Sequence, residues 1–230
     1  RTQIIKTAIH NKIFPTTVAP AVLERYDSPD GPMLKALEKQ FGPVKAIDEY
    51  ILSVAAKNYR EKLSLTSPKN LRILNFSEAT EGIPFSQYHT GINRKRSPGY
   101  PYCMTTKQKG KTKWFGTDEW IFNEHTQELQ DKINTDIKKM EQGLVQQYIF
   151  MDTLKDETRE IAKVAAKKTR VFAAVPMDFI IVFRMYFLDF LVYMMENRIL
   201  NESAVGIRSQ SFEWTILRNH LSEQGTRVVA

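Results

Sequence analysis

The chain has 230 residues, of which 42% are hydrophobic and 26% charged, proportions typical of a globular protein and not of a disordered one. Its 33 Lys and Arg residues exceed its 26 Asp and Glu residues, and the formal net charge of +7 permits a polyanionic partner without requiring one. The single cysteine excludes an internal disulfide, and four scattered histidines give no spacing typical of a structural zinc site.

The first half of the chain is rich in turn-forming residues. Residues 1–45 predict irregular structure with short extended pieces. Residues 46–63 place apolar side chains at helical spacing and predict an amphipathic helix. Residues 64–116 contain Gly and Pro throughout and predict loops and short strands. Thr117, followed by two acidic residues, is typical of a helix start, and we expect a helix over about 119–142.

The second half alternates short strands with helices. Residues 147–152 and 169–175 predict strands. Residues 177–199 predict a long helix that is apolar nearly all round and therefore buried. A last helix is expected from Ser211 to near Gly225, and residues 227–230 resemble the start of a strand.

Charged residues in the long helix have structural explanations. Asp178 is expected to cap its first turn, and Asp189 is expected to pair with a buried partner as part of the scaffold. The apolar stretch 179–195 includes Arg184 and Asp189, which argues against a membrane span. The first 15 residues contain no apolar core of a secretory signal.

One basic segment covers residues 91–113. It has seven Lys and Arg residues, no acidic residue, and interleaved Tyr side chains, a combination typical of single-stranded nucleic-acid binding. A solvated, lysine-rich hairpin is the alternative. The cations are Arg94, Lys95, Arg96, Lys107, Lys109, Lys111 and Lys113.

A second basic segment covers residues 155–170. Its cations recur every four residues, as on an exposed helical face. The competing interpretation is an extended finger that lays several cations along a triphosphate, since Arg grips phosphate oxygens with two hydrogen bonds and Lys supplies a point charge. We expect the extended finger, followed by a strand.

Four segments, in order, resemble those of picorna-like viral RNA-dependent RNA polymerases, with the insect-infecting dicistroviruses and iflaviruses most similar. Residues 11–23 are similar to the N-terminal fingertip region, and residues 204–207 with Trp214 resemble the segment before catalytic motif A. The other two are Ser97-Pro98-Gly99-Tyr100-Pro101-Tyr102, which resembles the template loop of motif G, and Lys155-Asp156-Glu157-Thr158-Arg159 with Lys163 and Lys168-Thr169-Arg170, which resembles motif F. The family often has Gly where Lys167 stands.

The resemblance implies an α+β fold: the fingers subdomain and the first part of the palm of a right-hand polymerase. Residues 1–65 would form a fingertip region, 66–186 the fingers, and 187–230 the helical start of the palm. The catalytic Asp-x4-Asp and Gly-Asp-Asp motifs do not occur in this order in the chain, so we expect no catalytic or metal-binding residue in it. Mg²⁺ or Mn²⁺ would be held in the complete enzyme, by ligands outside this chain. The absence of an initiator Met suggests trimming, or excision from a longer chain, and the resemblance implies a viral polyprotein.

The resemblance also assigns binding roles. The incoming nucleoside triphosphate would be bound by Lys155, Arg159, Lys163, Lys168 and Arg170. The single-stranded RNA template would be bound by Arg94, Lys95, Arg96, Ser97, Pro98, Gly99, Tyr100, Lys107, Lys109 and Lys111. The remaining palm and thumb would be further partners, and the expected location is the host cell cytoplasm, at replication complexes. A non-catalytic RNA-binding module and a basic structural domain are the alternatives.

Overall fold

The computed structural model describes residues 2–24, 30–66, 70–223 and 225. They fall into two compact units between which the chain alternates, and each unit is described by itself. The first unit comprises residues 1–46, 98–105 and 148–176, and the second comprises residues 47–97, 106–147 and 177–230.

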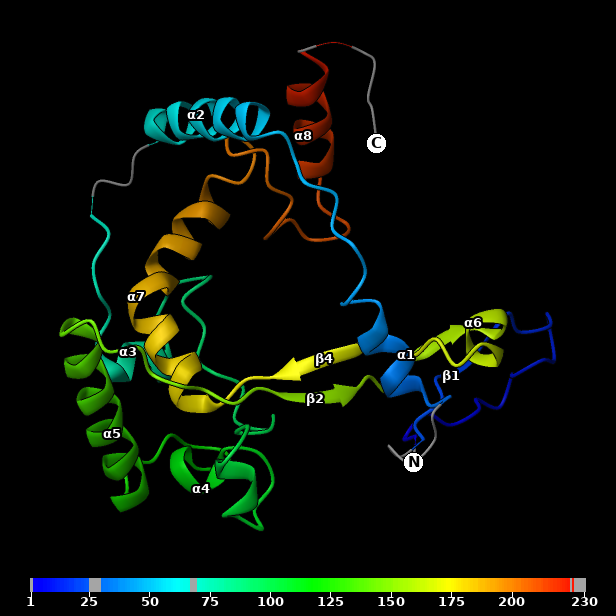
Figure 1. The fold of residues 1–230 in the computed structure, drawn as a ribbon, viewed down its shortest axis with the longest axis horizontal. Coiled ribbons are helices and arrows are strands. Elements are labelled where there is room, and N and C mark those ends of the chain that lie inside the picture. Colours follow the sequence, from blue (N-terminus) through cyan, green and yellow to red (C-terminus); the bar gives the residue numbers. More distant parts are fainter. Residues whose placement is uncertain (1, 25–29, 67–69, 224, 226–230) are drawn as a thin grey trace. The chain divides into compact units, whose positions relative to one another are not determined.

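The first unit contains two small antiparallel sheets. Strand β1 (Val18–Pro20) pairs with β3 (Thr158–Glu160), and β2 (Met151–Leu154) pairs with β4 (Val171–Ala174) as a two-stranded ribbon (Figure 1). The strand expected over 169–175 is confirmed as β4, the strand expected over 147–152 begins later, at Met151, and the two strands pair with each other. Helices α1 (Pro32–Glu38) and α6 (Ile161–Ala165) and the 3-10 turn Tyr102–Met104 complete this unit.

The basic segment 155–170 is neither a continuous helix nor fully extended. It begins as strand β3, turns into the five-residue helix α6, and returns to strand β4. The alternative of an exposed helix across the whole segment is therefore wrong, and the expected finger is extended only in part. Lys167 follows the C-cap of α6 and has a φ of 52°, so the turn keeps the left-handed conformation that glycine adopts most easily.

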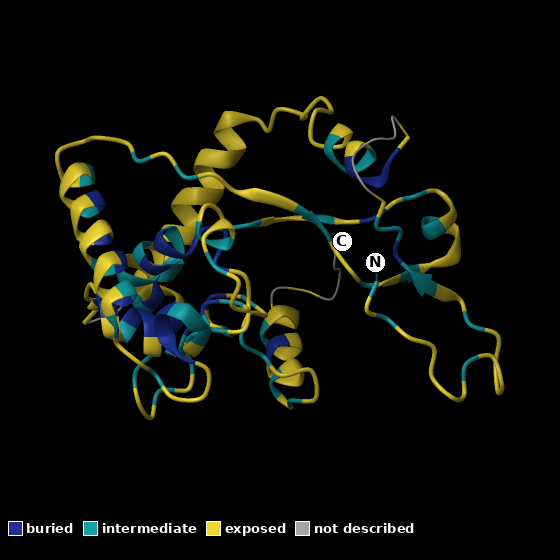
Figure 2. Ribbon diagram, turned by 90° about the horizontal axis from the view of Figure 1, so that it is seen from below, coloured by how far each residue is buried: buried dark blue, intermediate teal, exposed yellow. Residues whose placement is uncertain are grey.

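The second unit is helical. Its helices are α2 (Glu49–Leu65), α3 (Phe76–Glu81), α4 (Thr112–Phe115), α5 (Glu124–Glu141), α7 (Met177–Glu196) and α8 (Glu213–Ser222). Ala79 of α3, Ile133 of α5 and Ile181 of α7 are fully buried. Figure 2 shows buried residues gathered where helices pack together, while much of the β2–β4 ribbon is exposed.

Capping explains where these helices begin. Asp48 accepts hydrogen bonds from two backbone N–H groups of the first turn of α2, the helix expected over 46–63. Asn123 and Thr126 cap α5 reciprocally, so this helix begins at Glu124 and the expected start at Thr117 is wrong. The sequence interpretation also missed α3 and α4, which lie in the Gly- and Pro-rich stretch expected to be loops.

Helix α7 is buried on one face only. Ile181, Leu188 and Val192 lie in the core, whereas Phe183 and Phe187 are 41% and 50% exposed. The expectation of all-round burial is therefore wrong for this chain. Helix α8 matches the expected last helix, and the strand expected at 227–230 lies outside the described residues. None of the described helices combines the length and apolar character needed to cross a membrane.

Two polar clusters hold α7. Asp178 is the second residue of α7, so the expectation that it caps this helix is wrong. One of its carboxylate oxygens accepts the N–H of Phe179 at 2.9 Å, and the other lies 2.7 Å from Lys132 Nζ. Lys132 also pairs with Asp136 of α5 at 2.6 Å. The N-terminal end of α7 is thereby fixed to α5.

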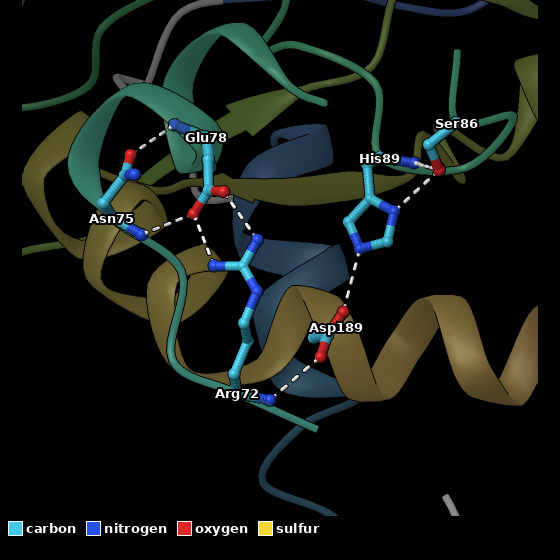
Figure 3. Close-up of polar contacts among 6 residues, drawn as sticks. All are labelled: Arg72, Asn75, Glu78, Ser86, His89 and Asp189. Atoms are coloured by element: carbon cyan, nitrogen blue, oxygen red, sulfur yellow. Dashed lines mark hydrogen bonds and ion pairs between the residues drawn. The ribbon is translucent and has the colours of Figure 1, made fainter. Parts of the chain in front are cut away.

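The second cluster surrounds Asp189 (Figure 3). Its carboxylate accepts the backbone N–H of Arg72 at 3.0 Å and lies 3.0 Å from His89 Nε2, which confirms that Asp189 is paired. His89 Nδ1 lies 2.7 Å from Ser86 Oγ, and this hydroxyl also accepts the backbone N–H of His89. The Ser86 hydroxyl thus closes the turn that ends at His89. Through His89, the chain of contacts from Ser86 to Asp189 fixes this turn to helix α7.

Arg72 continues this cluster through its guanidinium. It forms two hydrogen bonds with Glu78, at 2.7 and 2.5 Å, and Glu78 also accepts the N–H of Asn75. The hydrogen bonds from Arg72, with that from Asn75, lower the pKa of Glu78 to about 2. The beginning of α3 is therefore tied to the segment that leads into it.

Candidate functional site

Lys155 and Arg170 face each other at the end of the β2–β4 ribbon. The register pairs Leu154 with Val171, and the next pair is closed by a 2.8 Å hydrogen bond from the N–H of Lys155 to the carbonyl oxygen of Arg170. Directly opposed like charges destabilise an antiparallel pair. A carboxylate close to both side chains is therefore needed to hold them together.

Glu157 supplies that carboxylate. Arg170 donates from both Nε, at 2.5 Å, and a terminal nitrogen, so its guanidinium meets the carboxylate at two points. Lys155 Nζ lies 3.3 Å from Glu157 and a terminal nitrogen of Arg159 lies 3.7 Å from it. The hydrogen bond from Arg170 is the main cause that lowers the pKa of Glu157 to about 2. We call Lys155, Glu157, Arg159 and Arg170 the Glu157 cluster.

The N-terminal segment holds the Glu157 cluster in place. Arg159 pairs with Ala19 in the β1–β3 sheet, and the N–H of Ala21 donates to the carbonyl oxygen of Glu157 at 2.9 Å. Thr169, which is buried, donates its hydroxyl to the carbonyl oxygen of Val22 at 2.8 Å. Both ends of the basic segment are thus fixed by residues 19–22.

The structure does not bring Lys163 and Lys168 into this cluster. Lys163 Nζ pairs with Glu160 at 2.6 Å. Lys168 lines a separate cavity of about 510 Å³, together with Lys35, Glu38, Lys39 and Ala166. Of the five residues expected to bind nucleotide, three are gathered on one carboxylate and two lie elsewhere in the first unit.

The expected template residues are divided between the two units. Pro98, Gly99 and Tyr100 belong to the first unit. Gly99 has a φ of +74°, and a Cβ there would lie 2.5 Å from the carbonyl oxygen of Val175 and 2.6 Å from Pro176 Cα. Only glycine fits this contact, so the loop backbone rests directly on the chain that leaves β4, the strand that follows Arg170.

In the second unit, Arg94 is used internally. Its guanidinium donates to the carbonyl oxygens of Phe115, Asp118 and Glu119 at 2.6 to 3.0 Å and stacks over Trp120, 4.4 Å from the ring centroid. Through these contacts, the guanidinium of Arg94 holds the segment that follows α4 in place. The expectation that Arg94 contacts the template is corrected for this reason.

Lys111 is likewise turned inward. Its side chain is buried, and Nζ donates to three carbonyl oxygens of the segment before Pro98. An RNA phosphate has no access to this amine, so direct template contact by Lys111 is also corrected. The remaining expected template residues of this unit are exposed: Lys95, Arg96, Ser97, Lys107 and Lys109.

Glu157 is the residue of this cluster that the sequence interpretation did not assign to the site. It lies inside the motif that was noted, but as an acid among cations it was not counted as a site residue. Among the described residues, no three His, Cys, Asp or Glu side chains are grouped so that they could hold a metal ion. The carboxylate of Glu157 is paired with three cations, Lys155, Arg159 and Arg170.

Comparison with known proteins identifies the family. The sequence model described as viral RNA-dependent RNA polymerase matches residues 20–230, and the chain belongs to this family. It is 36% identical, over its whole length, to the replicase polyprotein of Cricket paralysis virus, and 36% identical over 99% of its length to that of Drosophila C virus. Both matches confirm the predicted resemblance.

A solved structure shows the same fold. The chain superimposes on the Sicinivirus 3Dpol RNA-dependent RNA polymerase with a TM-score of 0.70 and 26% sequence identity, over 97% of its own length. It spans 44% of that polymerase and 14% of each of the two insect-virus polyproteins. The mixed helical and sheet fold is thus that of a viral polymerase.

Proposed function

We propose that this chain supplies the fingers and the first part of the palm of a viral RNA-directed RNA polymerase, and that it binds template and nucleotide for RNA synthesis. The observation that carries this proposal is the Glu157 cluster, in a chain that belongs to the polymerase family. The division into a fingertip region (1–65), fingers (66–186) and palm start (187–230) is part of the proposal.

The Glu157 cluster would receive the triphosphate. Arg170 is 56% exposed at its side chain although two of its nitrogens are bound to Glu157, so it is oriented and still accessible to a ligand. Fixed cations stabilise the charge that develops in nucleotidyl transfer without reorganising. Lys163 and Lys168 would add positive charge along the path of the nucleotide.

The template would follow the exposed cations of the second unit. Lys95, Arg96, Lys107 and Lys109 can neutralise backbone phosphates. In the first unit, the exposed ring of Tyr100 offers a separate stacking surface. Pro98 and Gly99 are buried, and we assign to them the shape of the loop and not a direct contact.

The complete enzyme would use Mg²⁺ or Mn²⁺, which neutralises phosphate charge and activates the attacking oxygen. We place the ligands of that metal outside this chain. The 230-residue chain alone is therefore expected to incorporate no nucleotide on any template. Template-dependent incorporation by the pure chain would refute this division of the active site.

Binding of single-stranded RNA at several salt concentrations tests the proposal. If about five cations contact phosphates, the logarithm of the association constant should fall against the logarithm of salt concentration with a slope of about −3.5. A salt-independent affinity, or no binding, would refute it. A non-catalytic RNA-binding module would give the same slope, and nucleotide kinetics in the complete polymerase separate the two functions.

A further inference from the structure

A buried ammonium group lies inside the loop that precedes Pro98. Lys111 Nζ is 3.3, 3.1 and 2.9 Å from the carbonyl oxygens of Asn93, Arg96 and Ser97, and Lys111 is only 3% exposed. An ammonium group has three N–H donors, so these three carbonyls use all of them. Lys111 therefore ties both ends of segment 93–97 to one point.

The backbone of Lys111 is fixed independently of its side chain. Its N–H donates to the carbonyl oxygen of Arg94 at 2.6 Å, and its own carbonyl oxygen accepts the N–H groups of Trp114 and Phe115 at 3.1 Å. Gly110 has a φ of +66°, and a Cβ there would lie 2.2 Å from the Arg94 carbonyl oxygen. The two chain segments are therefore in direct backbone contact, and the amine is aimed into the loop.

The charge of Lys111 is not balanced by an acid. No Asp or Glu oxygen of the described residues lies within 4.0 Å of its Nζ. Burial alone lowers the pKa of this amine to about 8, so it remains mostly charged at neutral pH. A buried charge is tolerated only where its hydrogen bonds are made, and here the loop carbonyls make them.

We propose that Lys111 is a positioning residue for the template. It holds segment 93–97 in the shape that presents Lys95 and Arg96 to RNA phosphates, and it does not touch the RNA itself. Both of these side chains are exposed and lie between the carbonyls that Lys111 binds. The inference rests on the proposed function in RNA binding. It adds that Lys111 contributes to binding indirectly, through its hydrogen bonds to backbone carbonyls.

The test compares Lys111→Met with Lys109→Met in the 230-residue chain. Met keeps the length of the Lys side chain and removes its donors, and Lys109 is an exposed neighbour that serves as control. Affinity for a 20-nucleotide single-stranded RNA is measured over a range of salt concentrations. Lys111→Met should weaken binding about tenfold and lower the salt slope by up to about 1.4, because the phosphate contacts of Lys95 and Arg96 lose their geometry. Adding Lys111→Met to a Lys95→Met/Arg96→Met double variant should change binding no further. Lys109→Met should reduce the slope by about 0.7.

Two results would overturn the inference. A further loss of affinity when Lys111→Met is added to the Lys95→Met/Arg96→Met variant would mean that Lys111 contacts the RNA directly. Unchanged affinity in a folded Lys111→Met variant would mean that the loop shape does not matter for binding. A wild-type chain that binds no RNA would instead refute the proposed function, and this role of Lys111 with it.

A second measurement uses the wild-type chain and does not depend on the folding of a variant. Lysine amines are acetylated at pH 7 with an activated acetate ester, and the rate at each lysine is read by mass spectrometry. Lys111 should react far more slowly than Lys107 and Lys109, because its amine is buried and fully hydrogen-bonded. Equal rates at Lys109 and Lys111 would contradict the contacts on which the inference stands.

Discussion

Replacing Glu157 by Gln in the complete polymerase tests how the Glu157 cluster works. The substitution removes one negative charge from among three cations and keeps the size of the side chain. Arg170 now meets two carboxylate oxygens of Glu157. A Gln side chain offers one oxygen, and its NH₂ group would face a cation, so the two-point contact fails.

The expected effect is on kcat and not on nucleotide binding. Arg170 keeps its charge but loses its orientation, and misplacing a group by about 1 Å costs up to about 10²-fold in rate. We expect kcat to fall by roughly 10-fold to 10²-fold. The KM for nucleotide should not rise, because the cluster gains one unit of net positive charge.

Single-nucleotide incorporation on a preformed template–primer measures both quantities. Glu160→Gln is the matched control, because Glu160 pairs with one cation of the same segment, Lys163, and its side chain is 63% exposed. An exposed pair of this kind contributes little, and kcat should stay within about threefold of the wild type. Equal losses in the two variants, or an increased KM in Glu157→Gln, would refute the reasoning.

The contribution of Glu157 to stability should depend on pH. The pKa of Glu157 is lowered from its ordinary value of 4.5 to about 2, so its contribution is fully present above pH 4.5 and is lost as the pH falls through 2. The difference in melting temperature between wild type and Glu157→Gln should be constant above about pH 5 and shrink towards pH 2. A difference that persists at pH 2 in circular dichroism melts would contradict the assignment.

Three further variants test the fold. Gly99→Ala places a Cβ 2.5 Å from the carbonyl oxygen of Val175, in left-handed backbone. Urea denaturation should show that the free energy of unfolding falls by at least about 2 kcal/mol. A smaller decrease would mean that the loop shifts freely. Lys132→Met leaves the carboxylate of buried Asp178 without its ammonium partner and should lower the free energy of unfolding by about 1–3 kcal/mol. Lys138 is exposed, and Lys138→Met should change the free energy of unfolding by no more than about 0.5 kcal/mol. Equal effects of the two variants would refute the pairing. Lys167→Gly should melt about 2–4 °C above Lys167→Ala, because only Gly relieves the positive φ; the reverse order would contradict this.

The sequence predicts which long helices form better than it predicts the residues at which they begin and end. Apolar side chains identified α2, α5 and α7, and α5 and α7 bury one face, whereas no residue of α2 is buried. The start of α5 was misplaced because the capping pair Asn123 and Thr126 competes with the equally plausible Thr117. The short helices α3 and α4 were missed because neither rests on a repeating pattern. Helix α3 is stabilised by its capping box and by the burial of Phe76, and α4 by the burial of Trp114 and Phe115.

For the site, the sequence shows which cations are present and not which way they point. Arg94 and Lys111 have the same charge as Lys95 and Arg96, but contacts with distant carbonyls turn the first two inward. Glu157 was overlooked because local charge counting treats an acid as a loss of positive potential. Its role becomes visible only when the strand register sets Lys155 opposite Arg170.

The central claim is that the Glu157 cluster presents Arg170 to the triphosphate. The most direct test measures nucleotide kinetics and RNA affinity in the complete polymerase carrying Arg170→Ala or Arg170→Lys. We predict that Arg170→Ala lowers kcat/KM for nucleotide by roughly 10²–10³-fold and changes RNA affinity little, and that Arg170→Lys recovers only part, because a point charge does not reproduce the two-point contact. Strongly weakened RNA binding with an intact kcat/KM per bound template would contradict the claim.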